Sequence, residues 1–338
     1  MQALGEPATP GADQFMRGLL PASPWSAGSR LPATAIPKLP LDVIRAGRIA
    51  AGVHLALTGT ASAVDLDVRV GEPTSVPTPT LPAAFVVRTG GRTGHTVSVP
   101  ASSGRVRIAL PDREPDEVVR VYLPEAVEVR IDGLTAVGGT AVPAPRGPLW
   151  VAYGDSITQG WSVSEPDRAW PARVAAQLGL DGVNLGFAGS ARGELLAADA
   201  VAASGAAGVA VAWGTNAWSS LPTDAAQISE TMRIFLTALR QGLPDAPVVV
   251  VSPIVRPDAE TTPNRFGATL SDLRTAIEES VGRFAEATPD MRITVVPGRD
   301  LVSPRQLVDG VHPGDDGHRS IAAEVASHVA AGLAIAVD

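Results

Sequence analysis

The second half of the chain alternates short apolar runs with longer amphipathic stretches. The apolar runs predict buried strands at residues 149–153, 182–185, 208–213, 247–252 and 291–296. The stretches that separate them predict helices at residues 168–178, 194–203, 224–241, 265–287 and 315–334. Strands without a polar face that are separated by helices are typical of a parallel sheet covered on both sides. We therefore predict a doubly wound α/β domain over residues 149–338.

The first half of the chain has a different period. Short segments between residues 52 and 131 alternate apolar with polar residues, as in Val64-Asp65-Leu66-Asp67-Val68-Arg69-Val70, and Gly and Pro separate these segments. Alternation with a period of two indicates strands that have one buried and one solvated face. We predict an antiparallel β-sandwich domain over residues 41–140.

Two stretches show neither period. Residues 1–40 are rich in Pro, Ala and Gly and are predicted to form an irregular arm. Residues 141–148 are predicted to be the linker between the two domains, because they contain Pro143, Pro145, Gly147 and Pro148.

Composition excludes several classes of function. The net charge of -8 argues against nucleic acid or an anionic membrane as a partner. The absence of cysteine excludes disulfides, thiolate metal sites and a cysteine nucleophile. The segment Met1–Pro7 has no basic and apolar signal-peptide pattern, so we expect a cytoplasmic protein, or a secreted one if a signal has been removed. The apolar stretches fall short of the ~20 residues that a membrane-spanning helix needs.

A candidate nucleophile follows the first apolar strand of the second half. The run at residues 149–153 ends in Gly154-Asp155-Ser156, which suits a turn leading into a helix. Ligands of doubly wound sheets bind at the carboxyl ends of the strands, so Ser156 is placed where a reactive hydroxyl is useful. The alternative interpretation is that Ser156 only caps the helix.

A serine nucleophile needs a base and a group that orients the base. The chain carries Asp309-Gly310-Val311-His312-Pro313 before its last helix. An Asp three residues before a His can fold back so that its carboxylate meets Nδ1, which leaves Nε2 for the serine. The order Ser, Asp, His also occurs in α/β-hydrolases, but their Gly-x-Ser-x-Gly elbow is absent here, because Ile157 and Thr158 follow the serine.

These residues carry a resemblance to the GDSL, or SGNH, family of serine esterases and acylhydrolases. Residues 148–337 resemble the family and contain its four sequence blocks in order. The blocks are Gly154-Asp155-Ser156, Asn184-Leu185-Gly186-Phe187-Ala188-Gly189-Ser190, Gly214-Thr215-Asn216 and Asp309-Gly310-Val311-His312. The resemblance implies a flavodoxin-like sheet and a catalytic triad of Ser156, Asp309 and His312. A β-sandwich precedes the hydrolase in some carbohydrate esterases of this family.

The resemblance also implies an oxyanion hole. Its donors are the backbone amides of Ser156 and Gly189 and the side-chain amide of Asn216. A glycine lets its backbone approach the substrate closely, and an amide side chain adds an uncharged donor where negative charge develops.

Several other residues are conspicuous because of their position beside these sequence blocks or because of their chemistry. Trp161 and Trp218 directly follow catalytic blocks and are predicted to line the substrate pocket. Arg192 either contacts a polar substrate or pairs with Glu194. Asp155 is interpreted as a turn former, and His318 as a structural residue rather than a metal ligand. No metal and no organic cofactor is predicted.

The resulting hypothesis is a serine esterase that removes short acyl groups, in particular acetyl, from a sugar-like or secondary-metabolite alcohol through an acyl-enzyme. Its partner is a small-molecule ester. The alternatives are an acyltransferase that uses the same Ser156 site and a non-catalytic carbohydrate-binding relative. The sandwich is interpreted as a packing and lid partner, because Tyr122 and Phe85 do not amount to a row of aromatic residues. The sequence does not predict the oligomeric state.

Overall fold

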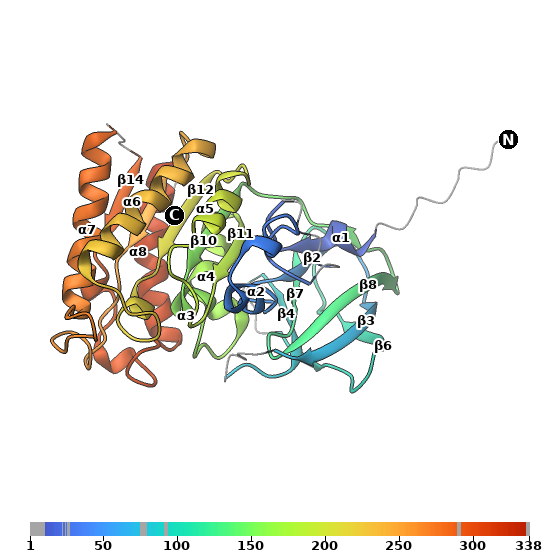
Figure 1. Ribbon diagram of the computed structural model, residues 1–338. Helices are drawn as coiled ribbons and strands as arrows, with labels where there is room; N and C mark the ends of the chain where they lie inside the picture. The colour runs from blue at the N-terminus through green and yellow to red at the C-terminus, as the bar shows by residue number, and fades with distance from the viewer. Residues whose placement is uncertain are drawn as a thin grey trace.

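The computed structural model describes residues 11–21, 23, 25, 28–74, 80–90, 94–288 and 292–335. Two parts lie side by side in Figure 1, the α/β part on the left and the antiparallel part on the right. Each part has its own buried cluster of apolar side chains.

The α/β part is built on a parallel sheet. Its strands lie in the order β11-β10-β12-β13-β14. Their bounds are Leu149–Gly154 for β10, Asp181–Gly186 for β11, Gly208–Ala212 for β12, Val248–Val251 for β13 and Ile293–Val296 for β14. The chain places β11 on one side of β10 and β12 on the other, so the direction of winding reverses at β10. The prediction of a doubly wound sheet is confirmed, and its topological switch point lies at the carboxyl end of β10.

Helices cover both faces of this sheet because alternate side chains of each strand point to opposite faces. On one face, Val151 and Tyr153 of β10 pack with α5 (Leu195–Ala202), α6 (Ala225–Gly242) and α7 (Leu270–Ala287). On the other face, Trp150 and Ala152 pack with α4 (Trp170–Leu178) and α8 (Asp315–Leu333). All four of these β10 side chains are fully buried, which explains why the strand sequence has no polar positions.

The predicted start of one helix at residue 265 is wrong. Helix α7 begins at Leu270, because Thr269 caps its amino end and forms a capping box with Asp272. The loop before it is held by Asn264, whose side chain donates to the carbonyl oxygens of Ala217 and Thr223 at 3.2 and 2.9 Å. The first residue of the strand predicted at 291–296 lies outside the described residues.

The antiparallel part has two sheets. One contains β1 (Met16–Arg17), β2 (His54–Thr58), β7 (Val119–Tyr122), β4 (Ala84–Thr89) and β5 (Thr96–Ser98), and β9 (Val142–Pro143) also pairs with β2. The other contains β6 (Gly104–Ala109), β3 (Ala63–Pro73) and β8 (Val127–Val137). The inner faces share one apolar cluster, and the outer face of the second sheet carries cross-strand ion pairs such as Arg107 with Asp65 at 2.7 Å.

The amino-terminal segment joins the two parts. It contains α1 (Ala12–Phe15), a 3-10 turn at Ile36–Lys38 and α2 (Leu41–Gly47), and β1 pairs with the sandwich strand β2. Val43 of α2 belongs to the apolar cluster of the α/β part. The fully buried Arg30 donates to the backbone carbonyls of Ala46, Asn184 and Gly186. This segment therefore packs against the sheet that carries the candidate site.

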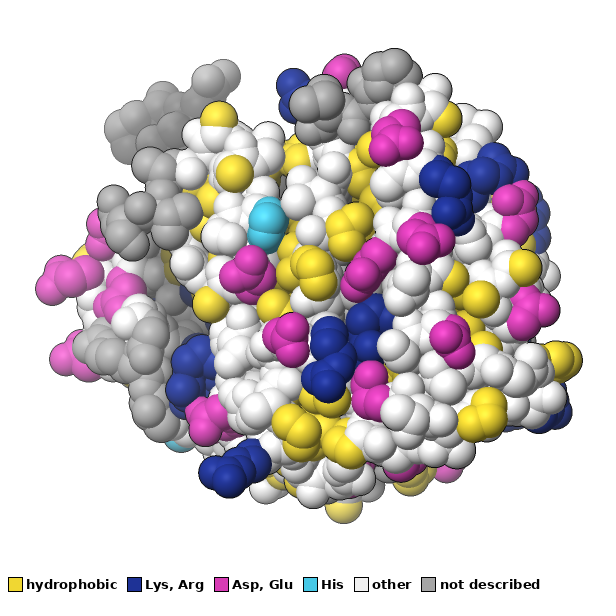
Figure 2. All heavy atoms as spheres, turned by 90° about the vertical axis from the view of Figure 1, so that its left-hand side faces the viewer, with side chains coloured by type: hydrophobic (Ala, Val, Ile, Leu, Met, Phe, Trp, Pro, Cys, Tyr) yellow, Lys and Arg dark blue, Asp and Glu magenta, His cyan; other side chains and the backbone are white. Residues whose placement is uncertain are grey.

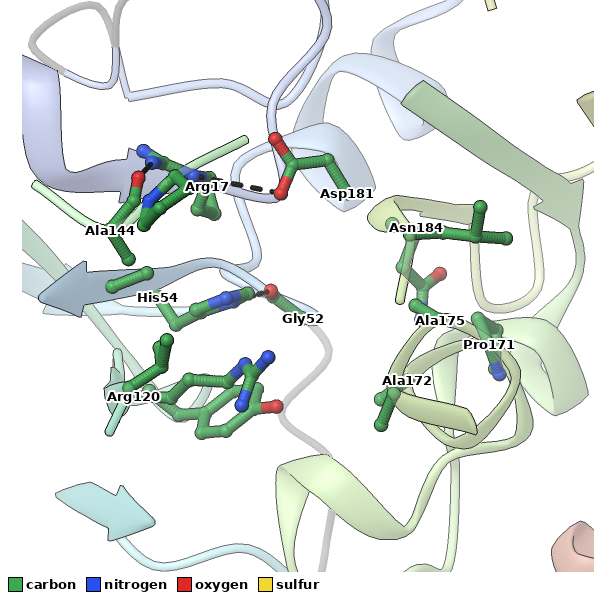
Figure 3. A pocket seen from close by; sticks show the side chains of 17 residues that line it. Arg17, Gly52, His54, Arg120, Ala144, Pro171, Ala172, Ala175, Asp181 and Asn184 are labelled. Carbon is green, nitrogen blue, oxygen red and sulfur yellow. Dashed lines mark hydrogen bonds and ion pairs between the residues drawn. The ribbon is translucent and has the colours of Figure 1, made fainter. Parts of the chain in front are cut away.

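A small cavity of about 80 Å³ lies between the sandwich on one side and α4 and β11 on the other. Figure 3 shows His54 and Arg120 on the sandwich side and Ala172 and Asn184 on the opposite side. The His54 ring donates from Nδ1 to the Gly52 carbonyl at 2.9 Å, and burial lowers the pKa of His54 to about 3. His54 is therefore neutral at neutral pH and has a structural role in the wall of this cavity.

The remaining elements are short. They are α3 (Ser156–Gln159) and 3-10 turns at Pro166–Arg168, Thr215–Ala217, Gly298–Asp300 and Pro304–Gln306. Figure 2 shows that acidic and basic side chains are interspersed over the face on the left of Figure 1. Within the described ranges, no helix is long and apolar enough to cross a membrane.

Candidate active site

Ser156 is the first residue of α3, directly after β10. The helix begins there because the Asp155 carboxylate caps it, accepting a hydrogen bond from the Ile157 amide at 3.0 Å. Gly154 is required at the end of the strand, since a Cβ atom there would collide with the Ala212 carbonyl and the Thr158 side chain. The Ser156 side chain thus stands at the switch point of the sheet.

His312 and Asp309 lie beside Ser156. Ser156 Oγ is 2.9 Å from His312 Nε2, and His312 Nδ1 is 2.7 Å from Asp309 Oδ2. The other Asp309 oxygen accepts the backbone amides of Val311 and His312 at 3.0 and 2.8 Å. The structure therefore has the folded-back arrangement that the sequence spacing suggests. Partial burial raises the pKa of Asp309, but these hydrogen bonds outweigh it and hold the pKa below its usual value.

The two predicted side donors border the same cavity as Ser156. Gly189 has a φ of +69°, a conformation that favours glycine, and Asn216 lies in the turn after β12 with only 6% of its surface exposed. The Asn216 side chain donates to the Ala191 carbonyl at 3.4 Å. The loop that carries Gly189 is fixed to α3, because the Gln159 side chain accepts the Ala188 amide at 3.1 Å.

Asp155 connects these elements. Its buried carboxyl also lies near the backbone amides of Gly214 and Thr215, which precede Asn216 and favour the charged form of the carboxyl. Burial raises the pKa of Asp155 to about 6, although these amides and the nearby His312 favour the charged form. One carboxyl group therefore caps the helix of Ser156 and lies beside the turn of Asn216, a wider role than the turn former that the sequence suggests.

The cavity over Ser156 has a volume of about 460 Å³. Its wall combines aromatic, small and polar side chains from six separate segments of the chain. The lining residues are Asp42, Ser156, Trp161, Ala188, Gly189, Ser190, Thr215, Asn216, Ser219, Arg256, Val311 and His312.

The three residues predicted to bind substrate have different positions. Trp161 lines the cavity, and its ring centroid is 5.6 Å from that of His312. Arg192 and Trp218 are not among the lining residues. Arg192 pairs with Asp42 and, at 3.3 Å, with Glu194. Trp218 lies under the Arg256 guanidinium, 4.6 Å from its ring centroid. Both residues therefore support a charged side chain of the wall.

Sequence reasoning missed Asp42 and Arg256. Asp42 belongs to α2, in the amino-terminal segment, and no local pattern connects it with a site that is more than a hundred residues away. Arg256 had a usable signal, because it lies in the loop that follows the buried strand β13. The rule that ligands bind at the carboxyl ends of parallel strands could have included it.

His318 is not part of this cavity. It is completely buried at the start of α8, and its Nδ1 accepts the Trp170 amide at 3.2 Å. Burial lowers the pKa of His318 to about 4, so its ring is neutral at neutral pH. In the described part of the chain, no three His, Asp, Glu or Cys side chains form a group able to hold a metal ion.

Comparison with known proteins identifies the family. The sequence profile of the GDSL-like lipase/acylhydrolase family matches residues 152–320. The protein belongs to this family of lipases and acylhydrolases. A search of curated protein sequences found no match.

Several solved structures share the fold over most of the chain. A GDSL-like lipase from Bacteroides ovatus has a TM-score of 0.79 and 19% identity, with 97% of this chain and 98% of that chain covered. The salicylyl-acyltransferase SsfX3 of a tetracycline biosynthetic pathway has a TM-score of 0.79 and 21% identity, with 96% of each chain covered. A family two carbohydrate esterase from Clostridium thermocellum has a TM-score of 0.63 and 17% identity, with 84% and 93% covered.

Proposed function

We propose that the protein is a serine esterase that hydrolyses short-chain acyl esters through an acyl-enzyme formed on Ser156. The observation that carries this proposal is the continuous hydrogen-bonded chain from Ser156 Oγ through His312 to Asp309, with distances of 2.9 and 2.7 Å. This order of groups provides a nucleophile, its base and the group that orients the base.

In the proposed reaction, His312 Nε2 accepts the Ser156 proton while Oγ attacks the acyl carbonyl carbon. Asp309 accepts the hydrogen bond from Nδ1–H and so holds His312 in the tautomer whose Nε2 is free to accept a proton. Its negative charge also stabilises the imidazolium that forms. His312 then donates its proton to the leaving alcohol oxygen. A water molecule attacks the acyl-enzyme by the same route and releases the carboxylic acid.

The tetrahedral intermediate carries a negative oxygen that needs donors. We assign this role to the amides of Ser156 and Gly189 and to the Asn216 side chain, all of which belong to residues that line the cavity. Removal of one such donor typically costs ~2.7–4 kcal/mol of transition-state stabilisation. No metal or cofactor enters this scheme.

The size of the cavity favours a small substrate. About 460 Å³ has to accept both halves of the ester, within the roughly 300–1,000 Å³ of ordinary ligand pockets. We propose an acetyl or similarly short acyl group on a sugar-like or secondary-metabolite alcohol. The carbohydrate esterase among the similar structures supports this choice.

Acyl transfer is the second candidate function. It uses the same acyl-enzyme, but an acceptor alcohol replaces water in the second step. The acyltransferase among the similar structures, which covers 96% of this chain, favours keeping it. Product analysis with and without an added alcohol distinguishes the two functions, because transfer yields a new ester.

The direct test is hydrolysis of 4-nitrophenyl acetate, butyrate and octanoate at pH 7 to 8. We expect kcat/KM to fall with chain length and to drop at least about 10³-fold in Ser156→Ala. Equal rates for the wild type and a folded Ser156→Ala protein would refute the esterase proposal. Rapid release of nitrophenol followed by a stalled acyl-enzyme would favour acyl transfer.

A further inference from the structure

Arg256 is held rigidly in the wall of the cavity that contains Ser156. Its Nε and Nη2 donate to the two carboxylate oxygens of Asp258 at 3.0 and 3.2 Å. The Trp218 ring covers one face of the guanidinium at 4.6 Å. Trp218 is fixed in turn, because its indole N–H donates to the Thr262 carbonyl at 2.8 Å. Arg256 therefore enters the cavity with a defined orientation.

This arrangement leaves one edge of the guanidinium unused. A guanidinium has five N–H donors in a planar fork and can bind a carboxylate at its Nε/Nη2 side or at its Nη1/Nη2 end. Asp258 occupies the Nε/Nη2 side, and the structure shows no hydrogen bond from Nη1 to any of the residues that it describes. The side chain is only 14% exposed and lines the cavity, so the free end is available to a ligand bound there.

The neighbouring carboxylates are already engaged. Asp42 carries the only carboxylate among the described lining residues, and it is paired with Arg192. Glu260 accepts the Arg256 amide at 3.0 Å and pairs with Arg274 at 2.8 Å. Neither carboxylate pairs with the Nη1 end of Arg256. That end of the guanidinium can therefore donate hydrogen bonds to a ligand.

We propose that Arg256 is the specificity-determining residue of the site and binds a carboxylate carried by the ester substrate. This inference rests on the proposed esterase function. The carboxylate lies on either the acyl or the alcohol half of the ester, and the planar fork recognises it in a two-point, charge-assisted contact. Trp161 and Val311, which also line the cavity, suit an apolar or aromatic spacer between the carboxylate and the ester bond.

The test uses two pairs of esters that differ only in charge. On the acyl side, 4-nitrophenyl 4-carboxybenzoate is compared with 4-nitrophenyl 4-carbamoylbenzoate. On the alcohol side, 3-acetoxybenzoate is compared with 3-acetoxybenzamide. Each amide has nearly the shape of its carboxylate but no charge, so the ratio of kcat/KM within a pair isolates recognition of the carboxylate.

The wild type is expected to prefer the carboxylate about 10- to 100-fold in one pair, since a hydrogen bond to a charged group is the stronger kind. The ratio should fall to about one in the double variant Arg256→Gln, Asp258→Asn, which leaves no unpaired carboxylate behind. Arg256→Lys should recover only part of the preference, because a lysine lacks the planar fork. Arg305→Gln, at an exposed arginine outside the cavity, should keep the wild-type ratio.

Two results overturn different claims. A wild-type ratio near one in both pairs, or a preference that survives in the double variant, overturns the role of Arg256 while hydrolysis remains dependent on Ser156. Hydrolysis of the neutral esters that is unaffected by Ser156→Ala overturns the esterase proposal itself.

Discussion

The Asp309 carboxylate holds the ring of His312, three residues further along the chain, with 2.7 Å between Oδ2 and Nδ1. Its second oxygen accepts two backbone amides of the same loop, so the carboxylate orients the ring and stabilises the loop at once. The short loop therefore holds His312 beside Ser156, in the position that the proposed reaction requires of its base.

The first prediction concerns this pair. Asp309→Asn should lower kcat by on the order of 10³–10⁴-fold, because the amide favours the wrong imidazole tautomer and does not stabilise the imidazolium. The measurement is steady-state hydrolysis of 4-nitrophenyl acetate, with circular dichroism to verify folding. Asp316→Asn, an exposed aspartate that pairs with Arg319, is the control and should retain activity. Comparable rates for the two variants would exclude Asp309 from the triad.

The second prediction concerns Asn216. Its replacement by alanine should lower kcat about 10²–10³-fold and change KM little, because the lost donor acts on charge that develops only in the transition state. The change in kcat and KM is measured with the same ester. A KM effect alone would make Asn216 a binding residue instead.

The third prediction concerns pH. The pKa of Asp155 is about 6 in the folded protein, above the ordinary value of 3.8, so the native state holds this proton more tightly than the unfolded state. Its contribution to stability is therefore largest at low pH and is lost as the pH rises from about 4 to 6. The free energy of unfolding of the wild type, relative to Asp155→Asn, should fall over this window when measured by urea denaturation. A constant difference would mean that Asp155 titrates normally.

The fourth prediction concerns Arg30. Its guanidinium is completely buried and donates to the backbone of α2 and of β11. Arg30→Ala leaves these carbonyls without donors, and we expect the free energy of unfolding to fall by about 2–4 kcal/mol. Arg305→Ala, at an exposed position, is the control and should change it by less than about 0.5 kcal/mol. Equal stabilities of the two variants would contradict the role assigned to Arg30.

The central sheet and the residues gathered at its edge were predictable from the sequence. The strands β10, β12 and β13 are buried on both faces, so their apolar runs stand out from the amphipathic helices around them. The resemblance to the family implied that Ser156, Gly189 and Asn216 lie near each other, and the common edge at which parallel strands end is consistent with it. The structure brings them to a common cavity.

The charged wall of the cavity was not predictable in the same way. The pair of Asp42 with Arg192 joins residues 150 positions apart, and no periodicity or local motif encodes such a contact. Trp218 was predicted to touch the substrate, but the chain folds so that Arg256 lies over it. Such contacts depend on how loops that follow different strands pack together. Local sequence patterns do not encode this packing.

The central claim is that Ser156 is the nucleophile, and labelling by a fluorophosphonate tests it most directly. The wild type should gain the mass of one phosphonyl group, located on the peptide that contains Ser156, while Ser156→Ala should remain unlabelled. His312→Ala should react much more slowly, because its serine lacks a base. A folded wild-type protein that stays unlabelled, or a Ser156→Ala protein that is labelled equally well, would contradict the account.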